Sequence, residues 1–424
     1  DPDHRAHEIG RGVMSGDAQA ITDYAASLFL RYFRRGILAG AESPEFDLQH
    51  DLDLLRSQWA VSRPVREFLG YVLTHPHEAQ SLLMFRTRID DAVARGRIDA
   101  RATAMLRLTS GLSSAVVADE PVRSFDTGPN QLVAWVVRHA TLHASRLLDE
   151  QPTESGYRSL VEPAMAELAA VKRLDALREP LKSASAARRP GVGAIRDASR
   201  SRRMLYRHAV AAYRALCDLE AGDEDALLEI IQSTLIAPVD VWRRFELAVA
   251  VGIGQALSEE TGAPMQLNIV ADGSATPIVE CGRLCIYWQS TTKHYTKPPP
   301  EPSEVRADVA LAAYGKGQSI DRPDLVVVDE HAGRALAIVE VKYLEGDTAN
   351  ARFREAMDQI VRYARGYGSA GEIDGIIRRS LIAVSREAPE LLDVSAPAPL
   401  ATDFPTMQKD GLLPWVRSRL LASS

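Results

Sequence analysis

The spacing of apolar residues changes near residue 230. Before that point apolar positions recur mostly at three- and four-residue intervals, with breaks rich in Pro, Gly, Ser and Asp, which is typical of successive amphipathic helices. The predicted helices are Ala18 to Phe33, Pro64 to Leu73, Glu78 to Arg95, Ala100 to Leu112, Asn130 to Leu148, Tyr157 to Leu177 and Ala194 to Glu220. Residues 1–230 are therefore expected to be mostly α-helical, apart from an acidic stretch at Glu42 to Asp53.

From residue 231 onward the pattern predicts an α/β domain. A long apolar helix, Val239 to Leu257, is followed by short runs rich in β-branched residues, and a helix from Phe353 to Tyr367 precedes the last of them. The predicted strands are Gln266 to Val270, Leu284 to Gln289, Leu325 to Asp329, Ala335 to Tyr343 and Ile376 to Ser385. We expect three regions: a helical and acidic segment at 1–60, a helical domain at 61–230, and an α/β domain at 231–424.

Two acids and a lysine interrupt the apolar pattern of one predicted hairpin. Asp324 follows Pro323, and Glu340 comes sixteen residues later, two positions before Lys342. Because side chains alternate along a strand, Glu340 and Lys342 share a face with aliphatic neighbours. An unpaired carboxylate there is costly, whereas a divalent cation such as Mg²⁺ accepts carboxylate oxygens. The alternative is a Glu-Lys pair on a solvated strand face that follows a Pro-Asp turn.

Further polar residues lie on the flanking predicted helices. Glu246 has apolar neighbours three and four residues away, so it either pairs with an arginine such as Arg243 or points toward Asp324 and Glu340. Gln359 and Tyr363 lie four residues apart beside the apolar stripe of their helix. The sequence leaves both interpretations of Glu246 open.

The order of these elements resembles the PD-(D/E)xK nuclease superfamily, in its branch with the RecB-type Gln-x-x-x-Tyr motif. Trp-Arg-Arg-Phe-Glu at 242–246 and Cys-Ile-Tyr-Trp-Gln at 285–289 are similar to segments of McrC-like restriction nuclease subunits. The similarity is good over residues 231–390 and thin before them, where the segment at 122–130 is similar to one that precedes the nuclease domain of such relatives. The resemblance implies a restriction-endonuclease-like αβββαβ core with a mixed central sheet.

The resemblance also implies a role for each residue of the site. The expected ligands of Mg²⁺ or Mn²⁺ are Glu246, Asp324, Glu340 and the carbonyl of Val341, and the expected catalytic set is Asp324, Glu340, Lys342, Gln359 and Tyr363. Phosphodiester hydrolysis suits such a set, because charge builds on the phosphoryl oxygens and a water must be aligned for attack.

The distribution of charge indicates which residues could contact nucleic acid. The net charge of −7 argues against uniform affinity for nucleic acid, but local basic patches decide binding. Arg196, Arg200, Arg203 and Arg207 form one stripe if residues 194–220 are a single helix, and Lys293 lies in a predicted loop near the site. The stripe either contacts phosphates or is a solvated helix face that pairs with acids or a partner.

Other features bear on the location and cofactors of the protein. No apolar run reaches the ~18 residues that a membrane span needs, and no signal-peptide pattern is present. The chain begins at Asp1 and not at a methionine, so we expect the N-terminal segment, residues 1–60, to be truncated. Three cysteines cannot supply the four ligands of the iron-sulfur cluster found in some RecB-type nucleases. A cytoplasmic location is expected.

Together these features predict a metal-dependent DNA endonuclease of a bacterial restriction or anti-phage system. The sequence lacks a Gly-x-x-x-x-Gly-Lys-Ser/Thr loop, so a nucleotide-hydrolysing partner or sensor would be a separate chain. A RecB-like exonuclease in DNA repair and a non-catalytic DNA- or protein-binding module remain alternatives. The target DNA, the number of metal ions and the oligomeric state are left open.

Overall fold

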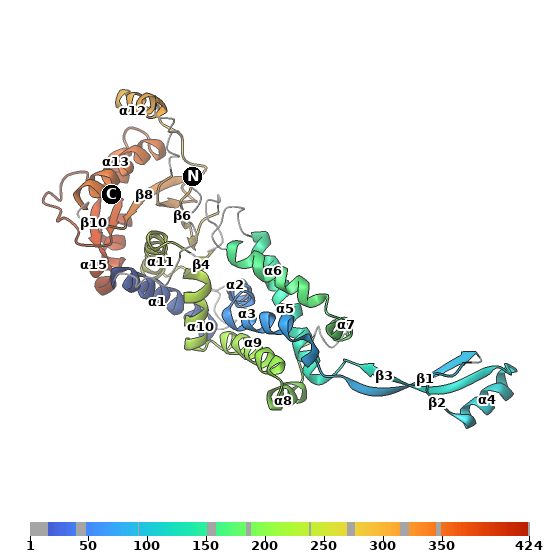
Figure 1. The fold of residues 1–424 in the computed structure, drawn as a ribbon. Helices are drawn as coiled ribbons and strands as arrows, with labels where there is room; N and C mark the ends of the chain where they lie inside the picture. Colours follow the sequence, from blue (N-terminus) through green and yellow to red (C-terminus); the bar gives the residue numbers. More distant parts are fainter. Residues whose placement is uncertain are drawn as a thin grey trace. The chain divides into compact units, whose positions relative to one another are not determined.

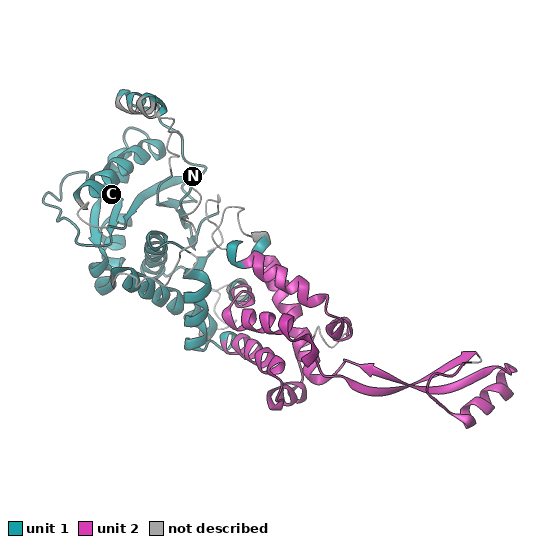
Figure 2. Cartoon of the chain, viewed as in Figure 1, with its two compact units in different colours: residues 1–55, 147–160, 219–424 teal, residues 56–146, 161–218 magenta. Residues whose placement is uncertain are grey.

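The computed structural model describes residues 16–39, 48–91, 93–150, 158–183, 188–236, 239–268, 276–313, 322–344 and 349–422. The chain forms two compact units, and each is built from separate stretches of sequence (Figure 2). Unit 1 comprises Asp1–Leu55, Leu147–Leu160 and Leu219–Ser424, and unit 2 comprises Arg56–Arg146 and Val161–Asp218. The predicted division into 1–60, 61–230 and 231–424 stays a prediction.

Unit 2 is mainly helical, as the apolar spacing predicts (Figure 1). In α3, for example, Val65, Phe68, Leu69 and Val72 recur at helical spacing and are all buried. The helices that lie wholly or largely in this unit are α3 (Arg63–Thr74), α4 (Ala100–Ser110), α5 (Gly128–Glu150), α6 (Arg158–Lys172), α7 (Asp175–Lys182), α8 (Val192–Arg200) and α9 (Met204–Glu220).

The predicted helix from Glu78 to Arg95 is wrong. After a 3₁₀ turn at Pro76–Glu78, β1 (Leu82–Asp91) pairs antiparallel with β3 (Ala115–Ser124), from Leu82↔Ser124 to Asp91↔Ala115. The short strand β2 (Arg97–Ile98) adds to the other edge of β3, and α4 lies against β3. The apolar spacing in this segment fits either structure, so pairing with a partner over twenty residues away decides the outcome.

The predicted helix from Ala194 to Glu220 is two helices. Helix α8 ends at Arg200, and Ser201 is extended with φ −65° and ψ 141°. The Ser201 hydroxyl accepts a hydrogen bond from the Arg203 amide at 3.2 Å, which competes with helical hydrogen bonding. The predicted helix from Tyr157 to Leu177 is likewise divided, between α6 and α7.

Unit 1 contains the mixed sheet that the resemblance implies. Its seven strands lie in the order β10-β9-β8-β7-β6-β5-β4; β8, β9 and β10 are parallel, and the remaining neighbours are antiparallel. The strands are β4 (Met265–Leu267), β5 (Val279–Cys281), β6 (Leu284–Trp288), β7 (Leu325–Asp329), β8 (Arg334–Lys342), β9 (Leu381–Val384) and β10 (Leu400–Asp403). The last predicted strand begins later than expected, because α14 (Ile373–Arg379) takes its first residues.

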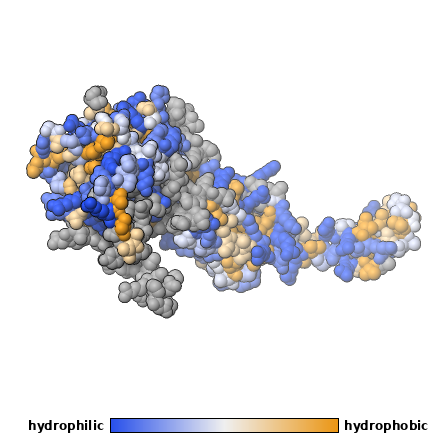
Figure 3. Space-filling view, turned by 90° about the horizontal axis from the view of Figure 1, so that it is seen from above, coloured by the Kyte–Doolittle hydropathy of each residue, from blue (hydrophilic) through white to orange (hydrophobic). Residues whose placement is uncertain are grey.

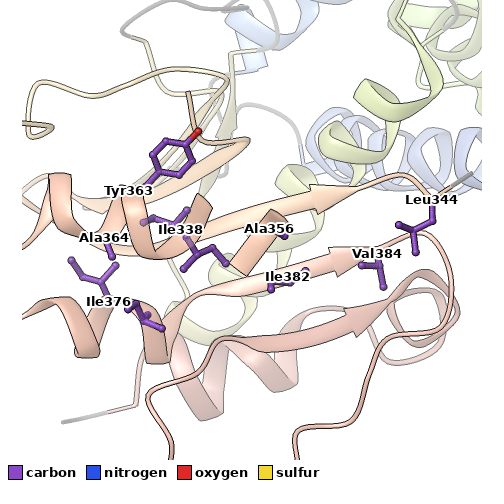
Figure 4. Close-up of a cluster of buried hydrophobic side chains, with 10 residues drawn as sticks. Ile338, Leu344, Ala356, Tyr363, Ala364, Ile376, Ile382 and Val384 are labelled. Carbon is purple, nitrogen blue, oxygen red and sulfur yellow. The ribbon is translucent and has the colours of Figure 1, made fainter. Parts of the chain in front are cut away.

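Helices cover both faces of this sheet. On one face, α14 and α13 (Ala349–Tyr367) bury Ala356, Tyr363 and Ile376 against Ile338 of β8 and Ile382 of β9 (Figure 4). On the other face lies α11 (Val241–Thr261), whose Gly254 closely approaches Val279 of β5. Val279 pairs with Ile286 of β6, so alternation places both on the face opposite the α13 cluster.

The other helices of unit 1 surround this core. They are α1 (Gly16–Ala39), α2 (Leu48–Ala60, ending in unit 2), α10 (Glu224–Ile230), α12 (Pro302–Ala313), α15 (Phe404–Asp410) and α16 (Leu413–Trp415), with π-helical turns at Ile231–Ile236 and Val416–Leu420. In the described parts of the chain, none combines the length and apolar character of a bilayer-crossing helix.

A β-bulge lies in the hairpin that carries the predicted acids. The pairing of β7 with β8 shifts register between Val327 and Val328, so that Val328 pairs with Ala335 and Val327 with Ala337. The predicted alternation of β8 therefore begins only after the bulge. It brings Ile338, which belongs to the α13 cluster, onto the same face as Glu340.

Gly366 in α13 is expected to control how the segment after β6 packs. A Cβ at Gly366 would lie 2.2 Å from Tyr295 Cε2, and Tyr295 also packs against Tyr367. Gly366→Ala should therefore lower the free energy of unfolding by about 1–3 kcal/mol. Gly371→Ala, with nothing within 4 Å of the added atom, is the control. Urea unfolding checks this, and equal stability of the two variants would contradict it.

Candidate active site

The β7–β8 hairpin brings together the residues that the sequence singles out. Asp324 immediately precedes β7, whereas Glu340 and Lys342 lie at the end of β8. Leu325 pairs with Val339, so the start of one antiparallel strand lies beside the end of the other. Three residues that are up to eighteen positions apart in sequence thus meet at one end of the hairpin.

The three side chains are in direct contact. Lys342 Nζ lies 2.7 Å from Glu340 Oε2 and 3.2 Å from Asp324 Oδ2. The amide of Val341 also donates to Asp324 Oδ2, at 2.8 Å. The alternative of a solvated strand face is wrong, because the side-chain exposure is 0% for Glu340 and 12% for Lys342.

Glu246 approaches the same place from α11. Its Oε2 accepts hydrogen bonds from Trp288 Nε1 at 2.7 Å and from Gln289 Nε2 at 2.9 Å. Gln289 Nε2 also lies 3.5 Å from Asp324 Oδ1. Arg243, the other candidate partner, lies over the ring of Trp242. Glu246 therefore points toward the hairpin acids.

Burial and mutual repulsion raise the pKa values of two of these acids. Burial, followed by the charge of Asp324, raises the pKa of Glu246 to about 8, although Trp288 and Gln289 oppose the shift. The same two causes hold the pKa of Glu340 well above its usual value. Burial alone would lower the pKa of Lys342, but Glu340 and Asp324 together outweigh it and raise that pKa. Lys342 therefore carries its proton at neutral pH.

Tyr363 and Gln359 lie on α13 beside the hairpin. The Tyr363 ring is buried, and its hydroxyl donates to the carbonyl of Arg322 at 2.9 Å. This contact holds the chain two residues before Asp324. Gln359 Oε1 is buried and, among the described residues, accepts no hydrogen bond. The Arg362 guanidinium lies 5.2 Å from the centre of the Tyr363 ring.

The predicted basic residues are exposed but do not form one stripe. Arg196 and Arg200 lie on α8, Arg203 in the connection, and Arg207 on α9. Arg203 donates to the carbonyl of Glu78. In contrast to these arginines, Leu205, Ala209, Tyr213 and Leu216 of α9 are all buried.

Lys293 lies after β6 with its side chain 70% exposed. Its Nζ lies 2.6 Å from Glu330 Oε2. The charge of Lys293 is therefore partly balanced by Glu330. Lys293 can contact a phosphate only if this ion pair breaks or if its ammonium binds both groups.

Sequence reasoning missed the roles of Trp288 and Gln289. Trp288 and Gln289 are consecutive residues at the end of a predicted, mostly apolar strand, where they carry an indole N–H and a carboxamide. That position was a usable signal, because polar groups at strand ends often serve a site. Their shared acceptor, Glu246, lies more than forty residues earlier and could not be paired with them from local pattern.

The donor set is suited to a hard cation. Glu246, Asp324 and Glu340 supply carboxylate oxygens, and the Lys342 ammonium contacts the last two of them. Buried acids in excess over bases are costly without a further cation, and Mg²⁺ prefers such oxygens. Within the described residues, no three His, Cys, Asp or Glu side chains are grouped closely enough to hold a metal ion as they stand.

Comparisons with known proteins give limited information. No protein-family model and no curated protein matches this chain. One similar solved structure is a half-complex from a tetradecameric assembly of Thermococcus gammatolerans McrB AAA+ hexamers with bound McrC, at 12% identity over 90% of this chain and 71% of the other, with a TM-score of 0.23. A likeness of that size adds nothing to the geometry described above.

Replacing Glu246 should change how stability depends on pH. An unfolded glutamate ionises near pH 4.5, whereas the folded pKa is about 8, so Glu246 contributes stability below pH 4.5 that is lost as the pH rises through about 8. Glu246→Gln does not titrate. Without metal, its free energy of unfolding relative to the native protein should therefore rise between about pH 5 and pH 9, by at least ~1 kcal/mol.

Urea unfolding in the presence of a chelator, repeated across this range, checks the expectation. Glu355→Gln, which removes an exposed carboxylate on α13, is the control. If the difference in free energy of unfolding between Glu246→Gln and the native protein does not change with pH, burial does not raise the pKa of Glu246.

Proposed function

We propose that this chain is a metal-dependent DNA endonuclease that hydrolyses phosphodiester bonds with a PD-(D/E)xK site. The observation that carries the proposal is the contact of Lys342 with both Asp324 and Glu340 at one end of a buried hairpin. Glu246 faces this cluster from a separate helix and is linked to Asp324 through Gln289. Three acids and a lysine in this arrangement suit the chemistry that the sequence motifs imply.

Asp324, Glu340 and the Val341 carbonyl would hold Mg²⁺ or Mn²⁺, with Glu246 as the outer acid. The bound ion would supply a Lewis acid for the phosphoryl oxygens and lower the pKa of a water ligand. Lys342, freed from its contact with Asp324, keeps its proton and donates to the attacking water or a phosphoryl oxygen. Because its raised pKa keeps it protonated at neutral pH, it would act as a hydrogen-bond donor and not as a general base.

The surroundings of the hairpin would hold this geometry. Tyr363 fixes the carbonyl of Arg322 and so the turn that carries Asp324. Gln359 has a buried carbonyl oxygen that could accept a hydrogen bond from a water. We assign DNA-backbone contacts to Lys293 and to the exposed Arg196, Arg200, Arg203 and Arg207, whose contributions would weaken with added salt.

We further propose that unit 2 binds a protein partner, a separate nucleotide hydrolase or sensor. The ribbon of β1 and β3 carries large apolar side chains that are exposed to solvent, and a cluster of such side chains often marks a protein-binding surface. Leu83, Phe85 and Ile89 are 62%, 67% and 62% exposed. Figure 3 shows apolar side chains on the surface of this slender part of unit 2. We therefore assign the docking surface for the partner to this ribbon.

A polar network fixes the base of the ribbon. Asn130 is fully buried and donates to the carbonyls of Gln80 and Phe125, at 2.8 and 2.7 Å. Its Oδ1 accepts from Tyr206 at 2.7 Å, and the Tyr206 hydroxyl in turn accepts from the Gln80 amide. The ends of both strands are therefore tied to α5 and α9, which suits a surface that presents an apolar patch to a partner.

Cleavage of covalently closed plasmid and of modified phage DNA tests the catalytic proposal. With Mg²⁺ or Mn²⁺, and with the protein encoded next door added, the native chain should nick closed circles. Glu340→Ala should abolish cleavage because it removes a metal ligand, and Lys342→Met should slow it at least ~100-fold. Glu355→Ala and Lys409→Ala are matched exposed controls.

Cleavage that survives Glu340→Ala would refute the site. Digestion of linear DNA alone, with closed circles untouched, would instead favour a RecB-like exonuclease. An absence of metal-dependent cleavage of any DNA, with bound DNA or protein still detected, would favour a non-catalytic binding module.

The ribbon proposal is tested by Phe85→Ser combined with Ile89→Ser. These exposed side chains contribute little to folding, so the free energy of unfolding should change by less than ~0.5 kcal/mol. Binding to the neighbouring gene product, measured by calorimetry, should weaken at least ~10-fold, because buried aromatic and aliphatic anchors dominate interfaces. Leu142→Ser, an exposed apolar position on α5, is the control. Unchanged binding would remove the ribbon from the interface.

A further inference from the structure

Gln289 has an unusual backbone conformation directly after β6. Among the described residues it is the one non-glycine with a positive φ, at 49°. Gly or Asn normally occupies this left-handed region, and a residue with a longer side chain is held there only when its surroundings demand it. The Gln289 amide donates to the Asp324 carbonyl at 2.9 Å, which continues the pairing of β6 with β7 and ties Gln289 to the hairpin.

The positive φ explains an arrangement that a regular strand cannot make. Successive side chains of a strand point to opposite faces. Trp288 is directed toward α11, where it donates to Glu246 Oε2, so a regular continuation would direct Gln289 away from that acid. The two consecutive side chains nevertheless reach the same oxygen, at 2.7 and 2.9 Å. The turn in the backbone is what brings the second one there.

The position of the carboxamide links two acids from different elements. Gln289 Nε2 lies 2.9 Å from Glu246 Oε2 on α11 and 3.5 Å from Asp324 Oδ1 at the start of β7. Its two N–H groups point in different directions, so one nitrogen can serve both oxygens. No other described side chain has a hydrogen bond to both acids.

We propose that Gln289 is a positioning residue, whose carboxamide sets the spacing of Glu246 and Asp324 for a divalent cation. This inference rests on the proposed function and deepens it. Gln289 would act by donating its Nε2–H groups to Glu246 Oε2 and Asp324 Oδ1, which would fix the orientation of the two carboxylates that would hold the ion. The strained φ is the cost of aiming this side chain between two acids. Outer contacts of this kind typically change metal affinity ~10- to 100-fold.

Two substitutions separate the side chain from the backbone. Gln289→Gly removes the carboxamide and tolerates the positive φ, so the free energy of unfolding should stay the same or rise. Gln289→Met keeps the shape and length of the side chain but has no donor. Both should weaken binding of Mn²⁺ to the full chain, measured by calorimetry without DNA, at least ~10-fold.

The control is Gln255→Met, which removes a half-buried carboxamide that donates to the Leu28 carbonyl elsewhere in unit 1. It should leave Mn²⁺ affinity unchanged. The loss of kcat in Gln289→Gly should be smaller at saturating Mn²⁺ than at low Mn²⁺, because excess ion compensates for weaker binding. A general loss of structure would not be rescued by added Mn²⁺.

The outcomes distinguish the two proposals. One outcome is that the native chain and both Gln289 variants bind Mn²⁺ equally well, whereas Glu340→Ala does not bind it. In that case the positioning role of Gln289 is wrong and the proposed nuclease site stands. If Gln289→Met binds Mn²⁺ normally while Gln289→Gly does not, the backbone turn and not the carboxamide is responsible, and the inference fails. If the native chain binds no Mn²⁺ at all, the metal site and the role of Gln289 fall together.

Discussion

The burial of Glu246 and Glu340 close to Asp324, with Lys342 in contact with two of the three acids, is the constraint on which the candidate site depends. Glu340 is fully buried, and its ionised form is tolerated only because Lys342 lies 2.7 Å away. Glu246 has no such ammonium within contact in the described structure; an indole and a carboxamide hold it instead. The raised pKa values of both glutamates express the same imbalance, which a bound cation would relieve.

The sheet of unit 1 makes this burial possible. Helix α11 covers one face and supplies Glu246, while α13 covers the other and fixes the chain before Asp324 through Tyr363. The β-bulge in the hairpin sets the face on which Glu340 lies, because one extra residue in β8 reverses the alternation that precedes it. The acids of the hairpin therefore meet where β7 begins and β8 ends.

Unit 2 shows a different balance between local pattern and long-range contacts. Its helices follow the apolar spacing, as in α3, where four buried residues form one stripe. The ribbon does not, because β1 exposes nearly all of its side chains and depends on pairing with β3. An exposed apolar surface of this kind suits binding to a partner, whereas the proposed catalytic residues lie in unit 1.

The sequence by itself determined the helices with a clear apolar stripe, the strands of the β7–β8 hairpin, and the identities of Asp324, Glu340 and Lys342 as a candidate set, since period and spacing are local properties. It could not determine the ribbon, which depends on pairing between segments distant in the chain. It also did not reveal the break at Ser201 or the late start of β9, where a local hydrogen bond and the adjacent helix α14 override the apolar spacing. Tertiary structure alone turned Glu246 toward the hairpin and brought Gln289 between two acids. Both results depend on contacts between residues more than thirty positions apart, and on a positive φ that no local preference for glutamine would predict.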